Sequence, residues 1–304
     1  MFKEDPIRWK KRGLIILPDY RRAWSQTHCM VPTPFMLDYG LLRIFFSGRD
    51  SQNRSSIGSV ILDLNQDGRI VENPPEPILT LGELGCFDDN GVTPSCVIRV
   101  KNKIHLYYIG WSLGGTTRMS LFGGLAISED EGKTFNRWSR APILERTIHD
   151  PLINTAPWVV QDKNDYRIYY VSGTEWVHKD LPRYLIKMGT SMDGLNWKRE
   201  GKVCLDYKDP EENALARPYV IRESGVWKMW FAFKGEKYRI GYAESADGVS
   251  WERRDHWAGI GVSDEGFDSE MIEYAAVVKY QGRSYMFYNG NNYGYEGIGW
   301  AVEE

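Results

Sequence analysis

Short runs of apolar residues recur along the whole 304-residue chain. Five of these runs are rich in aromatic residues and end at a glycine, and the five glycines are 62, 63, 62 and 55 residues apart. A second apolar segment, which starts at a proline or a tyrosine, precedes each aromatic run at a similar spacing. Two markers that share one period indicate an internal repeat of about sixty residues. The glycines are Gly48, Gly110, Gly173, Gly235 and Gly290.

Each repeat is predicted to be a set of β-strands, because its apolar runs are short and rich in Val, Ile, Tyr and Phe. A third strand is expected after the glycine. In three repeats it leads into a turn that contains Asp and Gly, at residues 128–135, 191–197 and 245–251. No segment has a convincing helical period. Units of four antiparallel strands at this spacing are typical of propeller blades. The short fourth strands are predicted at residues 77–80, 142–145 and 202–205.

The two ends of the chain are predicted to meet in one blade. The last repeat stops after its third strand, and residues 9–17 resemble the fourth strand at 197–205. We therefore expect residues 9–17 to pair in the same sheet as residues 295–302, which removes an exposed sheet edge. The prediction is an all-β fold: a five-bladed β-propeller with four antiparallel strands per blade, closed by the N-terminal strand, as one domain over 1–304. Two sandwiches in series are the alternative, but they would not explain five regular anchors.

Composition excludes several classes of partner. The net charge is −3, and acids and bases are mixed along the chain without the basic stripe that nucleic acid requires. The N-terminus is charged and no apolar stretch approaches the ~18 residues of a membrane span, so we expect neither a signal peptide nor a membrane partner. The four cysteines form no CxxC pair, which predicts free thiols in the cytoplasm, no metal site and no cofactor. The oligomeric state stays open.

The segments just before the first strand of each repeat carry acids, amides and imidazoles. In a propeller these segments meet at one mouth of the central channel, so an acid-lined pocket is expected. Crowded carboxylates repel one another, and a protonated acid beside an ionised one is the arrangement that glycosidic cleavage requires. Asp89 and Glu273 are the leading catalytic candidates, with Asp50, Asp150 and Glu212 in reserve.

Other polar and aromatic residues in these segments are candidates for substrate binding. Arg217 is aligned with Glu273 in the repeat, so both side chains are expected to face the channel. Aromatic rings could stack on sugar rings, and an arginine could orient an acid or bind a uronate or a phosphate. The alternative is structural, because an Asp beside Gly or Pro often caps a turn. The candidates are His28, Arg49, Asp88, Asn90, His149, Arg217, Glu270, Trp111 and Trp158.

The order of proline, apolar strand, aromatic strand and S-x-D-G-x-x-W turn, as at residues 191–197 and 245–251, resembles the five-bladed propeller glycosidases. That group includes arabinanases, β-xylosidases, invertases and mannoside phosphorylases. The resemblance covers nearly the whole chain and implies a carbohydrate-active enzyme with a carbohydrate or glycoside ligand, a glycoside hydrolase first of all. A glycoside phosphorylase or transferase is an alternative reading.

The resemblance also implies catalytic acids at fixed places, and this chain departs from them. The usual acid positions correspond to Thr33, Ala156, and Ala216 or Arg217. Either the acids have moved, to candidates such as Asp89 and Glu273, or the same scaffold carries a different chemistry. A non-catalytic sugar-binding propeller is the competing hypothesis. The turn at 128–135 also resembles the Asp-box of sialidases, but those enzymes have six blades and an arginine triad, which makes them a minor alternative.

Overall fold

Antiparallel β-strands supply almost all of the regular structure, as the short apolar runs predict. The computed structural model describes residues 7–304. Within that part of the chain, helical geometry is confined to three short 3-10 turns and to α1 (Asn291–Gly294). The strands are β1 (Trp9–Ile16), β2 (Thr27–Met36), β3 (Leu41–Arg49), β4 (Ser55–Asp63), β5 (Arg69–Glu72), β6 (Gly91–Val100), β7 (Lys103–Leu113), β8 (Met119–Ser128), β9 (Asn136–Arg137), β10 (Asn154–Asp162), β11 (Asp165–His178), β12 (Leu181–Ser191), β13 (Lys198–Leu205), β14 (Ala214–Glu223), β15 (Val226–Lys234), β16 (Tyr238–Ser245), β17 (Glu252–Arg253), β18 (Glu273–Tyr280), β19 (Arg283–Asn289) and β20 (Ile298–Glu303).

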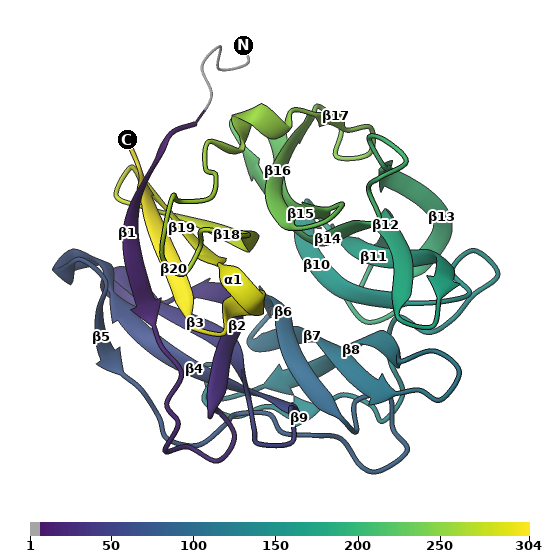
Figure 1. Cartoon of the computed structure of the whole chain (residues 1–304), viewed down its shortest axis with the longest axis horizontal. Helices are drawn as coiled ribbons and strands as arrows, with labels where there is room; N and C mark the ends of the chain where they lie inside the picture. The colour runs from purple at the N-terminus through teal and green to yellow at the C-terminus, as the bar shows by residue number, and fades with distance from the viewer. Residues whose placement is uncertain (1–6) are drawn as a thin grey trace.

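The strands follow one another as antiparallel meanders. β2, β3, β4 and β5 pair in that order, and the same order recurs in β6–β9, β10–β13 and β14–β17. Single parallel pairs, such as Ser55 with Gly91, join the third strand of one meander to the first strand of the next. Figure 1 shows the meanders arranged around a common centre, with β2, β6, β10, β14 and β18 nearest to it. The loops that precede these inner strands are therefore brought together.

The N-terminal strand completes the sheet formed by the end of the chain. β1 pairs with β20, and β20 pairs in turn with β19 and β18. Trp9 lies opposite Glu303 and Lys11 opposite Ala301. The Trp9 indole N–H donates a hydrogen bond to the Ala258 carbonyl at 3.0 Å. The predicted pairing of the N-terminal segment with the last strand is confirmed, and β1 covers the edge that β20 would otherwise expose.

The turns with the Ser-x-Asp-Gly pattern have the conformation that their sequence predicts. Ser191 Oγ accepts a hydrogen bond from the Gly194 N–H at 2.9 Å, while the Asp193 carboxylate accepts from the N–H groups of the two residues that follow Gly194. Ser245 and Asp247 form the same bonds in the next repeat. The Asp side chain thus replaces backbone partners within the turn and serves a structural role.

The predicted fourth strands are correct in one case out of three. Residues 202–205 lie in β13, as expected. Residues 77–80 contribute only a single bridge, and the fourth strand of that meander is β5. Residues 142–145 form no strand, since β9 pairs with β8 in their place. Both failed segments contain a proline, Pro77 or Pro142, which has no N–H to donate to a strand ladder.

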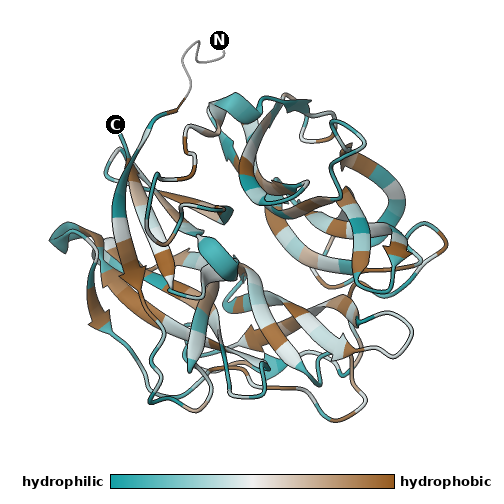
Figure 2. Cartoon of the chain, in the orientation of Figure 1, coloured by the Kyte–Doolittle hydropathy of each residue, from teal (hydrophilic) through white to brown (hydrophobic). Residues whose placement is uncertain are grey.

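The hydrophobic core lies between neighbouring meanders. The rings of Trp158 and Tyr219 are 4.1 Å apart, and the Trp158 indole N–H donates to the Val220 carbonyl at 2.7 Å, so β10 is packed against β14. Figure 2 shows hydrophobic residues along the strands and hydrophilic residues in most of the outer loops. Packing of each meander against the next fixes the inner strands around the centre. In the part of the chain described, no helix is both long enough and apolar enough to cross a membrane.

Candidate functional site

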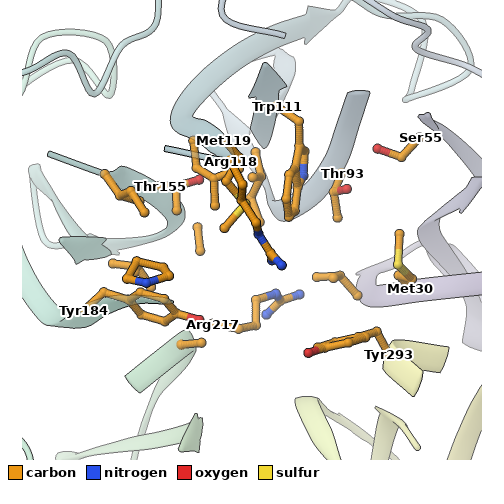
Figure 3. Close-up of a pocket in the computed structure, with 18 of the residues that line it drawn as sticks. Met30, Ser55, Thr93, Trp111, Arg118, Met119, Thr155, Tyr184, Arg217 and Tyr293 are labelled. Atoms are coloured by element: carbon orange, nitrogen blue, oxygen red, sulfur yellow. The ribbon is translucent and has the colours of Figure 1, made fainter. Parts of the chain in front are cut away.

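A cavity of about 600 Å³ lies where the inner strands come together. Every inner strand contributes to its wall: Val31 from β2, Thr93 from β6, Ala156 from β10, Arg217 from β14 and Tyr274 from β18. Figure 3 shows the labelled side chains directed into this space. The cavity is therefore the place where the repeats converge, and its size suits a small ligand.

Backbone irregularities aim side chains into this cavity. The register of strand pairing shifts in β2, β10, β14 and β18. At these shifts Val31, Ala156, Arg217 and Tyr274 have φ values of 55°, 48°, 49° and 57°. A non-glycine residue in this region costs about 1–3 kcal/mol and is concentrated at functional sites. Bulges of this kind re-aim side chains beside active sites.

The bulges also correct one alignment made from the sequence. The left-handed residue in β18 is Tyr274, whereas the left-handed residue in β14 is Arg217. Tyr274 is thus the structural equivalent of Arg217, and Glu273 is the equivalent of Ala216. The prediction that Glu273 and Arg217 share one register position is wrong by one residue. Both strands carry the same bulge, and it aligns Ala275, not Tyr274, with Pro218.

The cavity is lined by cations rather than by acids. Arg49, Arg118, Arg217 and Lys234 all line it, and within residues 7–304 the single acidic lining residue is Asp180. The expected acid-lined pocket is therefore wrong. Four like charges around a partly enclosed space create a positive potential that attracts anions.

Arg217 is the most buried of these cations. Its side chain lies over Trp158, 5.3 Å from the ring centroid, and its Nη2 donates at 2.9 Å to the Pro32 carbonyl and to Thr33 Oγ1. Nε and Nη1 are buried without a hydrogen-bond partner among the described groups. Burial lowers the pKa of Arg217 to about 10, so the guanidinium stays charged at neutral pH. In Figure 3 the Arg118 guanidinium extends toward it. Unpartnered buried donors are costly, and an anion would satisfy both groups.

Glu273 is a buried acid immediately behind the cavity wall. The residue is fully buried, and neither carboxyl oxygen has a partner in hydrogen-bond geometry within the described chain. Lys234, Tyr274 and Tyr293, which line the cavity, all interact electrostatically with it. Burial raises the pKa of Glu273 well above its usual 4.5, and Tyr274 and Lys234 offset only part of that effect. Burial therefore favours the protonated, neutral form of Glu273, which is the form that can supply a proton.

Tyrosines form the wall between Glu273 and the cavity. The hydroxyls of Tyr184 and Tyr238 are 2.6 Å apart, and the Tyr238 ring lies 5.9 Å from Tyr274 and 6.2 Å from Tyr293. Burial raises the pKa of Tyr184 to about 12, so its hydroxyl is neutral. Neutral hydroxyls both donate and accept hydrogen bonds, which suits the hydroxyl groups of a sugar.

Several of the predicted acids hold their own meander together instead of lining the cavity. Three aspartates each accept a hydrogen bond at 2.9 Å from the hydroxyl of a tyrosine twenty residues later. Each also pairs with a Lys or Arg of the same meander. Glu212 has the equivalent place and pairs with Arg253 at 2.6 Å. The expectation that these acids converge on one pocket is corrected. The three pairs are Asp88 with Tyr108, Asp150 with Tyr170, and Asp268 with Tyr288.

Replacement of Asp150 by asparagine is expected to lower the free energy of unfolding by about 3 kcal/mol, because it removes the buried negative charge that pairs with both Lys187 and Arg199. The Asp150 side chain is completely buried, and its oxygens lie 3.0 Å and 3.3 Å from these cations. Denaturant unfolding measures the loss. Glu200→Gln is the control, since its ion pair with Lys198 is exposed and should contribute less than about 1 kcal/mol. A loss below about 1 kcal/mol at Asp150 would contradict the structural role.

Three further predicted acids also bind groups close to them. The Asp50 carboxylate accepts from the backbone N–H of Gln52 and of Arg54, both at 2.9 Å, and so closes its own loop. Asp89 accepts from the Gly85 N–H at 2.9 Å. Glu270 forms an exposed ion pair with Lys237. None of these three acids lines the cavity in the described structure.

The remaining predicted residues divide into two groups. Arg49, Asn90 and Trp111 line the cavity together with Arg217. His149 is exposed on the surface, and Trp158 lies in the core beneath Arg217. His28 is half-buried, with its ring against Tyr295, and burial together with the nearby Arg49 lowers the pKa of His28 to about 4. His28 is therefore neutral at neutral pH and lies outside the cavity lining.

The cations and the tyrosine wall include residues that sequence reasoning missed: Arg118, Lys234, Tyr184, Tyr238, Tyr274 and Tyr293. Arg118 precedes β8 and its backbone N–H donates to the Lys179 carbonyl at the tip of the β11–β12 hairpin. That contact joins two different meanders, so no local pattern reveals it. Tyr274 was aligned with the prolines of the other four repeats, whereas the structure places it one residue earlier, at the position of Arg217.

Comparison with known proteins places the chain in a family. No family model matches it. It is 42% identical over 300 residues to "Uncharacterized protein Rv1502" of Mycobacterium tuberculosis strain H37Rv, covering 98% of this chain and 100% of the relative. The chain belongs to the same family as that protein. Over 129 residues it is also 26% identical to the 1,2-beta-oligomannan phosphorylase of Thermoanaerobacter sp. strain X514, which covers 40% of each chain.

Solved structures share the fold at low sequence identity. A structure described as "Glycoside hydrolase" has a TM-score of 0.78 and 20% identity, covering 99% of this chain and 93% of the other. A thermostable family-43 glycoside hydrolase has a TM-score of 0.66 and 18% identity, covering 91% and 88%. These neighbours show that the all-β chain has a fold of the propeller type found in glycoside hydrolases, as the resemblance in the sequence implies.

Proposed function

We propose that this protein is a single-domain, five-bladed propeller enzyme that cleaves a glycosidic bond in its central cavity. The repeated meanders and the pairing of β1 with β20 support that architecture. One observation carries the functional proposal: the buried acid Glu273 lies directly behind the cavity wall, and the guanidinium of Arg217 in that wall has unpartnered donors. A proton source beside an anion site is what glycosyl transfer to an anionic acceptor requires.

The cations favour phosphate over water as the acceptor. Phosphate offers several oxygens to the donors of a guanidinium, and Arg binds it through paired hydrogen bonds. Arg217 retains two unpartnered nitrogens, and Arg118 and Lys234 supply further positive charge. The partial similarity to a protein named as an oligomannan phosphorylase points the same way. We therefore infer phosphorolysis, with the cytoplasm as its place.

The reaction balances with the groups that are present. A phosphate oxygen forms a bond to the anomeric carbon as the bond from that carbon to the leaving oxygen breaks. The leaving oxygen takes up a proton, and the products are a glycosyl phosphate and a free hydroxyl. Glu273 supplies that proton through the hydroxyl of Tyr274, which must first turn to form a hydrogen bond with the carboxyl, a bond that the structure does not contain. Arg217 holds the phosphate and offsets its charge. The tyrosine hydroxyls of the cavity bind the sugar.

Hydrolysis is the second candidate, because Asp180 also lines the cavity and could serve as the base that activates water. The fold shared with glycoside hydrolases favours this alternative. Hydrolysis requires two carboxyl groups on opposite sides of the sugar, and it leaves the four cations of the cavity without a role. A sugar-binding protein without activity is the third outcome of the test.

The experiment is a screen of the reverse reaction, in which a sugar 1-phosphate and an acceptor sugar form a glycoside and release phosphate. Purified protein is mixed with a panel of sugar 1-phosphates and free acceptor sugars, starting with mannose 1-phosphate and mannose, and released inorganic phosphate is measured. The proposal predicts release that requires both the donor and an acceptor. Cleavage of oligosaccharides in phosphate-free buffer without any such release would favour hydrolysis, and sugar binding without either activity would favour a binding protein.

A further inference from the structure

One wall of the cavity is aliphatic, and of the cavity tyrosines Tyr184 packs against it. Ile109, Met119, Leu121, Ile153 and Val171 form a continuous hydrophobic cluster, and all five line the cavity. They come from β7, β8, β11 and the residue just before β10, whereas Lys234, Tyr238, Tyr274 and Tyr293 come from β15, β16, β18 and α1. Figure 3 shows Met119 and Tyr293 on opposite sides of the space. The cavity therefore has an apolar side and a charged, hydroxyl-rich side.

A fully hydroxylated sugar would not match the aliphatic wall. A sugar hydroxyl pressed against Ile109 or Leu121 would lose its water partners and gain none, at a cost of about 1–3 kcal/mol. The wall consists mainly of branched and thioether side chains, which pack on saturated carbon. An alkyl group, by contrast, gains about 0.8 kcal/mol for each methylene that it buries.

We propose that the glycoside bound in this cavity carries a saturated alkyl group, which packs on the aliphatic wall while the cations hold the anion. This inference rests on the proposed function and names the substrate class for the same site. Arg118 lies beside Met119 in the chain and shares the cavity with it, so charge and apolar surface are adjacent. An amphiphilic ligand with an anionic end and an alkyl part satisfies both.

The apolar wall extends to the outer rim of the cavity. Leu113 lines the cavity yet is 74% exposed, and Leu181 and Pro182 line it from the β11–β12 hairpin. An exposed leucine at the mouth of the cavity, such as Leu113, continues the apolar surface of the aliphatic wall toward the solvent. A chain of several carbons is therefore accommodated, and affinity should rise with chain length until the rim is reached.

The test uses n-alkyl phosphates, which require no knowledge of the sugar. Dissociation constants for inorganic phosphate and for methyl, butyl, hexyl and octyl phosphate are measured by titration calorimetry on the full chain. We expect binding to tighten up to about fourfold per methylene, the equivalent of 0.8 kcal/mol, and then to level off. Met119→Gln should flatten this dependence while leaving the affinity for inorganic phosphate unchanged.

Two control variants distinguish the contribution of the aliphatic wall from a general effect of substitution on affinity. Met192→Gln changes the same side chain in an exposed turn and should retain the full chain-length dependence. Leu113→Ser, at an exposed position that tolerates replacement, should weaken only the longer chains. Inorganic phosphate that binds with no added affinity from alkyl chains would overturn this inference and leave phosphorolysis standing. Failure of every phosphate to bind would overturn both.

Two sources of the alkyl group are distinguished by a second series in the presence of phosphate. If the alkyl group is an aglycone, n-alkyl mannosides should compete with substrate more strongly as the chain lengthens. If it belongs to the sugar ring, 6-deoxy or O-methyl sugars should compete better than their hydroxylated parents. A preference for the fully hydroxylated sugars in both series would contradict the proposal.

Discussion

Replacement of Glu273 by glutamine is expected to lower kcat about 10²–10⁴-fold at pH 7, the usual contribution of a positioned general acid. Glutamine has the shape of glutamic acid but cannot release the proton. The carboxyl is fully buried, and burial raises its pKa well above 4.5, which favours the protonated form that a general acid requires. Steady-state kinetics with the sugar 1-phosphate identified by the screen measures the loss. Unchanged turnover would remove Glu273 from the mechanism.

The same variant should show how burial of Glu273 affects stability. A carboxyl whose pKa is higher in the folded state favours folding below its unfolded pKa, and this contribution is lost as the pH rises above that value toward the folded pKa. Glu273→Gln should therefore be as stable as the wild type near pH 4.5 and relatively more stable at higher pH. Asp50→Asn, a carboxyl-to-amide change outside the cavity, is the control for activity and should keep turnover near the wild-type value.

Replacement of Arg217 by glutamine is expected to raise the KM for phosphate about 10–100-fold, since a hydrogen bond to a charged group contributes about 1.5–3 kcal/mol. Nε and Nη1 are the unpartnered donors that the anion would satisfy. Arg217→Lys should recover only part of the affinity, because an ammonium lacks the planar fork of donors. Phosphate-dependent initial rates measure both effects.

Arg43→Gln is the matched control for Arg217. Arg43 is also a buried arginine, with 4% of its surface exposed, and its Nη1 donates to the Gly132 carbonyl outside the cavity. Its replacement should leave the KM for phosphate within about twofold of the wild type, whatever it does to stability. Equal effects at Arg43 and Arg217 would mean that the loss at Arg217 is a general consequence of damage to the core.

The repeats and the pairing of the N-terminal strand with the last strand were predictable because their signals are local or periodic. Short aromatic runs ending in glycine predict strands wherever they occur, and Ser-x-Asp-Gly turns form their bonds within a few residues, as at Ser191. The pairing of β1 with β20 was predictable because residues 9–17 repeat a pattern found elsewhere in the chain. The fourth strands of the meanders were harder to predict from the sequence. They are short and lie outermost, and a proline such as Pro142 removes the donor that would extend them.

The chemistry of the site was less predictable because it depends on the direction of side chains. Asp150 and Glu212 stand in the loops that approach the centre, yet they turn back to cations of their own meanders. The twenty-residue spacing from Asp to Tyr is visible in the sequence and could have indicated this structural role. The convergence of Arg118 and Lys234 depends on contacts between meanders, and a one-residue bulge shifts Tyr274 into the cavity.

The most direct test of the central claim is the identity of the product. Wild-type protein is incubated with β-1,2-linked mannobiose, and with any other glycoside that the screen identifies, in the presence and absence of inorganic phosphate, and phosphorus-31 NMR follows the reaction. The account predicts a glycosyl phosphate that forms only when phosphate is present and that Glu273→Gln does not produce. A free reducing sugar that forms at the same rate with or without phosphate would contradict it.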